Sequence, residues 1–246
     1  MAGPDEVRDD LRLTALNAKD EEPLRSFYRD VLAPAFPSDE LAQFDRLAAR
    51  LDSTEAPASV VLAQNQADTI LGGIVGEYFP ISRALLLTYL VVRPTNRNQG
   101  IGEKLLGEVV PTWIDRWQPL LGVGEVEDPR CFPGAGNSAI ARLRLYRRFP
   151  QVRIGLSTYI QPRLRPDGVR VPHMLLLVFY VDPSIVLKAE ANPTVDGHAV
   201  RRFLEEYYTV AEGMSGLRDP EVQRQLDAAA PEGGLTLLPL AGLLTS

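Results

Sequence analysis

The sequence predicts an α/β fold, in the α+β form with a mixed sheet. Two observations support this. Short apolar runs bounded by turn residues alternate with segments whose apolar residues recur at helical spacing. The run at 85–92 is almost wholly apolar, which is typical of a central strand buried on both faces, and a glycine-rich turn follows it directly.

The first part of the chain predicts one strand and two helices. Residues 11–16 alternate apolar and polar side chains, as a short strand does. Within 22–32 the apolar residues fall at helical spacing. Ser38 is a suitable N-cap for a second helix, and acidic residues follow it in the first turn. The apolar face of this helix runs from Leu41 to Leu51.

Three strands and a helix are expected next. The runs at 59–63 and 69–78 are separated by a short polar turn, so a hairpin is the simplest connection. The strand at 85–92 comes third. After the glycine-rich turn, leucines and valines at helical spacing predict a helix over 103–113.

The pattern then continues with a strand, a helix and a strand pair. We expect a strand over 120–126 and a basic helix over 138–149. Strands over 152–160 and 174–181 are separated by Pro166-Asp167-Gly168, a strong turn signal.

The sequence changes character after residue 184, and we expect a mainly helical extension there. Domain boundaries are expected at 1–184 for the main domain and 185–246 for the extension. Helices are predicted over 195–214 and 220–229, with an apolar tail over 235–244. The first of these helices has an apolar face suited to core packing or a homodimer contact: Phe203, Leu204, Tyr207, Tyr208 and Val210.

Composition narrows the function classes. The 246 residues carry 26 Lys and Arg against 32 Asp and Glu, a net charge of -6, without the basic block of a nucleic-acid binder. The longest apolar run, at 174–181, is too short to span a membrane. The N-terminal segment lacks the basic and apolar regions of a secretory signal, so a cytoplasmic protein is expected.

The glycine-rich turn is the most informative motif. Gly100 and Gly102 allow close approach of the backbone, and the following helix begins with N–H groups that lack intrahelical acceptors. Such a turn suits an anion such as phosphate. The residues after Gly102 are Glu-Lys-Leu, so the chain has neither a P-loop nor a Gly-x-Gly-x-x-Gly fingerprint.

Arg97-x-x-Gly100-x-Gly102, directly after a buried strand, resembles the acyl-CoA pyrophosphate loop of the GNAT superfamily of N-acetyltransferases. The predicted order of elements is similar to the GNAT fold over residues 10–182. The resemblance implies acetyl-CoA, or another short acyl-CoA, as donor and a primary amine as acceptor, with no metal. The positions that it implies for CoA binding are Leu90, Val91, Val92, Arg97, Asn98, Gln99, Gly100, Ile101, Gly102, Glu103 and Asn137.

The resemblance also suggests catalytic residues. Tyr146 partly matches the family tyrosine that protonates the thiolate leaving group. In some relatives a glutamate on the fourth strand acts as the general base, and Leu86 stands at that position here. We therefore expect Glu125, Glu127 or Glu77 to hold a water that acts as the base, or to bind a cationic acceptor, with Glu125 the first choice. Tyr89 offers a further way to orient a water, although a core role is the simpler interpretation.

The remaining reactive side chains suggest no second chemistry. His173, His198 and Cys131 are too far apart in the sequence for a metal-ligand motif. The alternative to an enzyme is a non-catalytic module that binds acyl-CoA or a protein partner, because Leu86 and the irregular surroundings of Tyr146 depart from the family pattern.

Overall fold

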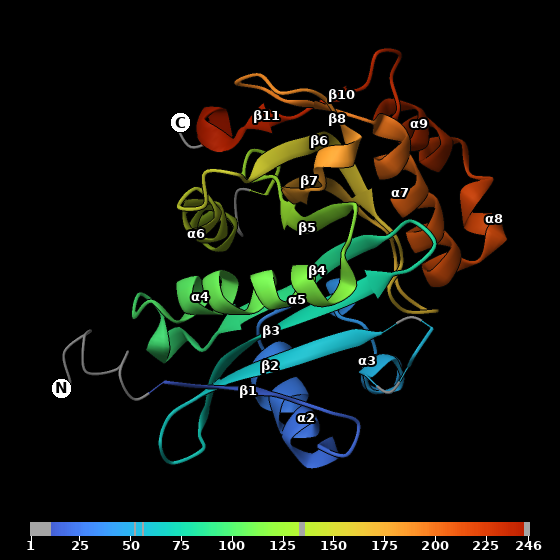
Figure 1. Cartoon of the computed structure of the whole chain (residues 1–246). Coiled ribbons are helices and arrows are strands. Elements are labelled where there is room, and N and C mark those ends of the chain that lie inside the picture. The colour runs from blue at the N-terminus through green and yellow to red at the C-terminus, as the bar shows by residue number, and fades with distance from the viewer. Residues whose placement is uncertain (1–10, 52, 56, 133–135, 244–246) are drawn as a thin grey trace. The chain divides into compact units, whose positions relative to one another are not determined.

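The computed structural model describes residues 11–51, 53–55, 57–132 and 136–243, and its elements follow the predicted chain order (Figure 1). The chain forms two compact units. The first contains residues up to 78 together with 87–118, and the second contains 79–86 together with the chain from 119 onward. Each unit has its own hydrophobic core.

The first unit contains antiparallel strands. Leu13 lies opposite Ala63. Val60 lies opposite Val75, and this second pairing confirms the predicted hairpin. The amide of Arg93 donates to the carbonyl of Leu71 at 2.8 Å, beside the last strand. In spatial order the strands are β1 (Arg12–Ala15), β2 (Ala58–Gln64), β3 (Ile70–Phe79) and β4 (Ala84–Val92).

Helices cover both faces of this sheet. The ring of Phe27 lies over Gly73 on one face, and the indole of Trp113 lies over Gly76 on the other. The first face is covered by α2 (Glu21–Phe27), which continues as a π-helical turn (Tyr28–Leu32), and by α3 (Phe44–Leu51). The second is covered by α4 (Ile101–Lys104), a π-helical turn (Leu105–Val109) and α5 (Val110–Trp117).

The predicted start of the second helix at Ser38 is wrong. Ser38–Glu40 form a separate 3₁₀ turn, and α3 begins at Phe44. The hydroxyl of Tyr89 explains the break, because it accepts the amide of Ala42 at 2.8 Å and donates to the carbonyl of Glu40 at 3.2 Å. These backbone groups are therefore diverted from helical hydrogen bonds.

The helix predicted over 103–113 is longer than expected and irregular. Helical structure begins at Ile101 and continues to Trp117, with the π-helical turn directly before α5. Pro111 lies in the first turn of α5 and has no N–H to donate to the preceding turn. A widened turn accommodates such a residue without ending the helix.

The second unit is built on strands in the order β5, β7, β6 and β11. These are β5 (Leu121–Glu127), β7 (Val171–Val181), β6 (Arg153–Gln161) and β11 (Leu238–Pro239). A small second sheet contains β10 (Leu235–Thr236), β9 (Thr194–Val195) and β8 (Val186–Lys188). The helices are α6 (Gly136–Tyr146), α7 (Gly197–Glu212), α8 (Met214–Leu217) and α9 (Pro220–Ala229).

The C-terminal helices share the core of the second unit with β5, β6 and β7. Phe203, Leu204, Tyr207 and Tyr208 of α7 are buried as expected, but Val210 is 45% exposed and does not belong to the apolar face. The hydroxyl of Tyr208 donates to the carbonyl of Ile160 in β6 at 2.7 Å. The segment after residue 184 is thus integrated into this unit.

A buried carboxylate of α7 holds the turn between β3 and β4. Glu206 accepts hydrogen bonds from the amide of Ile81 at 3.2 Å, the amide of Ser82 at 2.7 Å and the hydroxyl of Ser82 at 2.6 Å. Phe79, in the same turn region, packs edge-on against Phe203 and Tyr207 of the same helix. These contacts lie within the second unit.

The predicted basic helix ends earlier than expected. It stops at Tyr146 rather than Phe149, and a tight turn follows in which the amide of Phe149 donates to the carbonyl of Tyr146 at 2.9 Å. Pro150 disfavours helical conformation at the residue before it. Among the described residues, no helix combines the length and hydrophobicity required to cross a bilayer.

Candidate functional site

The predicted phosphate loop connects β4 to α4 in the first unit. A short 3₁₀ turn (Pro94–Asn96) leads into Arg97, which is extended. Asn98 and Gly100 then adopt left-handed backbone conformations, with φ values of 62° and 79°. Gly100 is the N-cap of α4, so glycine stands at the position where a side chain would be strained.

This loop leads directly into the start of a helix. The amide of Lys104 donates to the carbonyl of Gly100 at 2.9 Å, which closes the first helical turn. The amides of the preceding helical residues have no acceptor within a helix, and the helix dipole favours negative charge at this end. The loop therefore has the geometry of an anion site.

Two side chains of the loop add to this character. The guanidinium of Arg97 donates through Nε to the carbonyl of Val92 at 3.3 Å, and its side chain remains exposed. The Oε1 atom of Gln99 is buried and has no hydrogen-bond partner among the described residues. An orphaned polar atom in a binding loop suits a ligand with hydrogen-bond donors, so these residues fit the CoA group that the resemblance implies.

The strand residues expected to bind the pantetheine arm lie just before the loop. Leu90 and Val92 are half-buried, and Val91 is buried at the end of β4. Gly72 of β3 lies against them: a Cβ atom there would lie 2.5 Å from the carbonyl oxygen of Val91. The glycine therefore keeps the two strands close at the predicted donor segment.

Tyr146 is the last residue of α6, in the second unit. It is only 7% exposed, and burial raises the pKa of its phenol to about 12, against the opposing charge of Arg142. Arg142 lies one helical turn earlier. The phenol is therefore protonated at neutral pH, as a proton donor must be. Asn137 lies in the same helix, but its side chain is outside the described part of the structure.

Glu127 forms an ion pair with Arg142. The carboxylate is at the end of β5, with 7% of its side chain exposed, and the guanidinium of Arg142 is 21% exposed. The guanidinium occupies Oε2 of this carboxylate, so that atom is not available to hold a water or a cationic acceptor. The pair instead connects β5 to the helix that carries Tyr146.

Glu125 lies two residues earlier on β5, in a cluster of neutral donors. Its Oε1 accepts the hydroxyl of Tyr159 at 2.6 Å. Its Oε2 accepts the amide Nε2 of Gln161 at 2.7 Å and the hydroxyl of Tyr207 at 3.3 Å. The three donors are buried, whereas Glu125 itself is only half-buried. Glu125 and Glu127 thus have different surroundings and different chemical character.

The other two candidates of the first unit have structural partners. Glu77 pairs with Arg50, whose Nε lies 2.9 Å from Oε2, and both side chains are less than a tenth exposed. The hydroxyl of Thr88 also donates to Glu77, at 3.1 Å. Tyr89 is buried and bonded to the backbone between the 3₁₀ turn and α3. We assign these side chains to the core.

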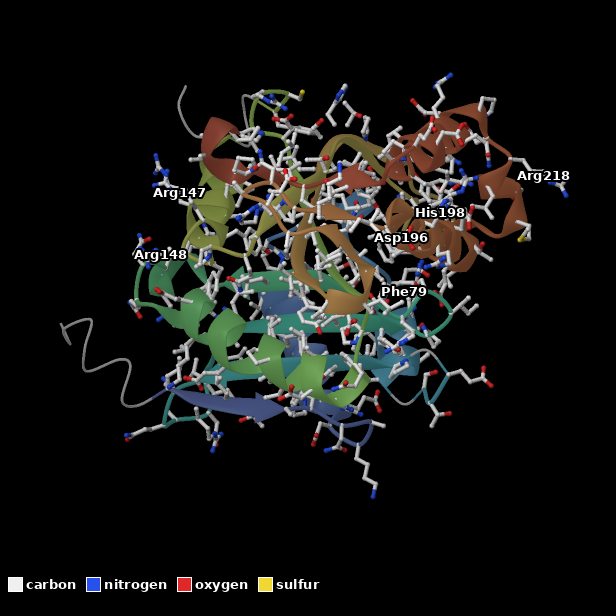
Figure 2. All side chains as sticks on the ribbon, turned by 45° about the horizontal axis from the view of Figure 1, so that its top comes forward. Phe79, Arg147, Arg148, Asp196, His198 and Arg218 are labelled. Carbon is white, nitrogen blue, oxygen red and sulfur yellow. The ribbon has the colours of Figure 1, made fainter. Side chains whose placement is uncertain are left out.

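No metal centre is evident in the part of the chain that the structure describes, where no three His, Cys, Asp or Glu side chains form a group suited to a cation. The ring of His173 packs edge-on against Phe132. His198 is the second residue of α7, and its backbone amide donates to the side chain of the N-cap residue Asp196 at 3.0 Å (Figure 2). Arg147 and Arg148 project outward just after α6 in the same view.

Sequence reasoning did not find the partners of the candidate carboxylates. Arg142 falls within the predicted basic helix over 138–149, and no motif marks Tyr159, Gln161 or Arg50. Their roles depend on which strands and helices pack together, and no local spacing carries that information. The period-two spacing of Tyr159 and Gln161 on β6 is the only local signal that places both on one face.

Comparison with known proteins extends these observations. No family model and no curated protein matches the sequence. The structure is similar to a GNAT-family protein from Bacteroides thetaiotaomicron, with a TM-score of 0.55 and 19% identity over 82% of this chain and 99% of that one. It also matches a GNAT-family acetyltransferase from Elizabethkingia anophelis with acetyl-CoA bound, with a TM-score of 0.48 and 21% identity over 70% and 99%. The first likeness confirms the predicted fold: this chain has the GNAT fold.

Proposed function

We propose that this protein is an N-acetyltransferase that moves an acetyl or other short acyl group from acyl-CoA to a primary amine. The loop from Arg97 to Glu103 carries the proposal. In a chain with the GNAT fold, a left-handed Gly100 caps the helix directly after β4, and the buried Oε1 of Gln99 has no partner among the described residues. The protein is proposed to act in the cytoplasm, on a small molecule or a protein.

The loop would bind the donor through its backbone. The amides from Gln99 to Glu103 would hold the pyrophosphate, and Arg97 would add positive charge. Backbone groups of residues 90–92 would pair with the pantetheine arm, and Asn137 is a further predicted contact. The carbonyl of the thioester needs polarisation by a backbone N–H, since negative charge develops on its oxygen.

The transfer itself is a direct attack. An amine bound as its ammonium ion first gives one proton to water. The neutral nitrogen then bonds to the thioester carbonyl carbon and the C–S bond breaks, the nitrogen gives a second proton to water, and the thiolate takes a proton from a general acid. We assign the last step to Tyr146, which is protonated at neutral pH and lies near the charge of Arg142. Glu127 is assigned to holding Arg142.

Ligand-dependent thermal unfolding tests the donor site. A ligand that binds only the native protein raises its unfolding temperature, so acetyl-CoA and CoA should stabilise the protein and ATP should not. Gly100→Val, which places a branched side chain at a φ of 79°, should abolish that shift. Absence of any shift with either CoA form at millimolar concentration would overturn the proposal.

Tyr146→Phe separates an enzyme from a binding module. The substitution removes only a hydroxyl group, so the variant should still be stabilised by CoA. For an enzyme, turnover should fall about 10²- to 10⁴-fold, the range of general acid catalysis. If thiol release from acetyl-CoA is undetectable in the wild-type protein with a broad amine panel while CoA binds, the non-catalytic module is the correct interpretation.

A further inference from the structure

The hydrogen bonds around Glu125 define a second polar site, within the second unit. Tyr159, Gln161 and Tyr207 reach the carboxylate from two elements, β6 and α7. Tyr207 is held by Phe79 and Phe203, whose rings lie 5.4 and 5.5 Å from its own. The carboxylate is thus oriented by side chains that are themselves fixed by packing.

The amide of Gln161 has a defined orientation. Its Nε2 lies 2.7 Å from Oε2 of Glu125, and exchanging the amide nitrogen and oxygen would bring two acceptors together. Oε1 must therefore point away from the carboxylate. It is buried, in a side chain only 5% exposed overall, and it has no hydrogen-bond partner among the described residues.

An unsatisfied buried carbonyl is costly, and native proteins retain one chiefly where water or a ligand satisfies it. The missing partner must be a hydrogen-bond donor. The partner must also be compatible with a nearby carboxylate. Oε1 and Nε2 of Gln161 are bonded to the same carbon atom, and Nε2 is hydrogen-bonded to Glu125. A group that combines positive charge with several N–H donors meets both requirements, and an ammonium ion is the most compact such group.

The surrounding donors favour a binding role for Glu125. Three hydrogen bonds from β6 and α7 hold its carboxylate in place. Burial and the charge of Glu125 raise the pKa of Tyr159 well above its usual value, so this phenol remains a donor. Glu125 is half-buried and keeps part of its surface accessible.

We infer that this site binds a primary alkylamine as its ammonium ion, with the charged head group held by the carboxylate of Glu125 and by Oε1 of Gln161. The inference rests on the proposed function in taking this amine as the acyl acceptor. Each alkyl substituent on the nitrogen replaces an N–H donor, so primary amines should be preferred over amines with substituted nitrogen.

Calorimetric titration tests the site without acyl transfer. Butylamine at pH 8 is added to the full-length protein, alone and with saturating CoA. Binding is expected in at least one of these states. Butanol, which lacks the charge, and butyltrimethylammonium, which lacks N–H donors, should bind at least about tenfold more weakly. Equal affinity for butanol, or no butylamine binding in either state, overturns the inference.

Three variants assign the contacts. Glu125→Gln should weaken butylamine binding at least about tenfold, because the charged acceptor is lost. Gln161→Met keeps a side chain of similar size but removes both the donor that orients Glu125 and the acceptor Oε1. Tyr159→Phe removes only an orienting donor. The loss of butylamine affinity should therefore be larger for Gln161→Met than for Tyr159→Phe. Equal effects would refute direct contact by Gln161. Glu232→Gln removes the same charge from an exposed turn and should leave binding unchanged.

The two proposals fail separately. CoA-dependent thermal stabilisation reports on the loop of the first unit, whatever happens at Glu125. Loss of butylamine binding with intact CoA binding would reject only the ammonium site. Thermal unfolding of each variant without ligand identifies any that do not fold, and Tyr159→Phe, which keeps the ring and its packing, provides a mild second probe.

Discussion

Replacing Gly72 by alanine is expected to destabilise the first unit. A Cβ atom at this position would lie 2.5 Å from the carbonyl oxygen of Val91 and 3.1 Å from the Cα atom of Val92. Both atoms belong to the backbone of β4, so no rotamer change relieves the clash and the strands must separate. Overpacking of this kind costs about 1–3 kcal/mol.

Gly107→Ala is the matched control in the same unit. Gly107 is exposed in the π-helical turn, and a Cβ atom there would meet nothing within 4 Å. Alanine should stabilise the protein by about 0.5–1 kcal/mol, since glycine loses more conformational freedom on folding. The two variants should therefore differ by about 1.5–4 kcal/mol in free energy of unfolding.

Urea unfolding at equilibrium measures this difference, provided that both variants keep the same dependence on denaturant. Because Val91 and Val92 belong to the predicted donor segment, Gly72→Ala should also reduce the thermal shift caused by CoA, while Gly107→Ala should not. A Gly72→Ala variant as stable as Gly107→Ala would show that β3 and β4 are not as close as described.

Three further predictions concern charged and phenolic groups. Arg50→Met leaves a buried carboxylate without its cation and should lower the free energy of unfolding by about 3–5 kcal/mol in urea; an unchanged midpoint would refute the ion pair. Burial raises the pKa of Tyr146 to about 12, so its phenolate absorbance, obtained by difference from Tyr146→Phe, should appear near pH 12 in the folded protein. The associated stability is present below about pH 10 and is lost as the pH rises toward 12, and titration near 10 would contradict the burial. Burial opposes ionisation of Glu212, but hydrogen bonds from Arg170 and a backbone amide outweigh it and lower the pKa. The stability gained from Glu212 is therefore present above its unfolded value of about 4.5 and is lost as the pH falls, and Arg170→Met should reduce this acid dependence; an unaltered pH profile of unfolding would exclude the pair.

The sequence was sufficient to predict the element order and the glycine-rich turn, because both depend on local signals. Apolar periodicity predicted the strands and helices, and two glycines directly after a buried strand predicted the turn before α4. The predicted ends of elements were less accurate where a side chain from a distant part of the chain forms hydrogen bonds with the backbone. The start of α3 depends on Tyr89, and no property of residues 38–44 reveals that hydroxyl.

The candidate carboxylates show the same limit. Glu125 and Glu127 lie two residues apart on one strand, so their spacing places both on one face and does not distinguish their surroundings. The structure distinguishes them, because Arg142 neutralises one and three uncharged donors surround the other. Such differences arise from the packing of segments far apart in the chain, which spacing within one strand does not encode.

The contact between Glu206 and the turn at 79–82 has a consequence for biosynthesis. During translation the N-terminal part of a chain emerges first, and segments fold as their partners become available. The amides of Ile81 and Ser82 obtain their carboxylate acceptor only after α7 has been made. The β3–β4 turn is thus completed late on the ribosome, and a chain that terminates after residue 184 would leave these amides without their carboxylate acceptor.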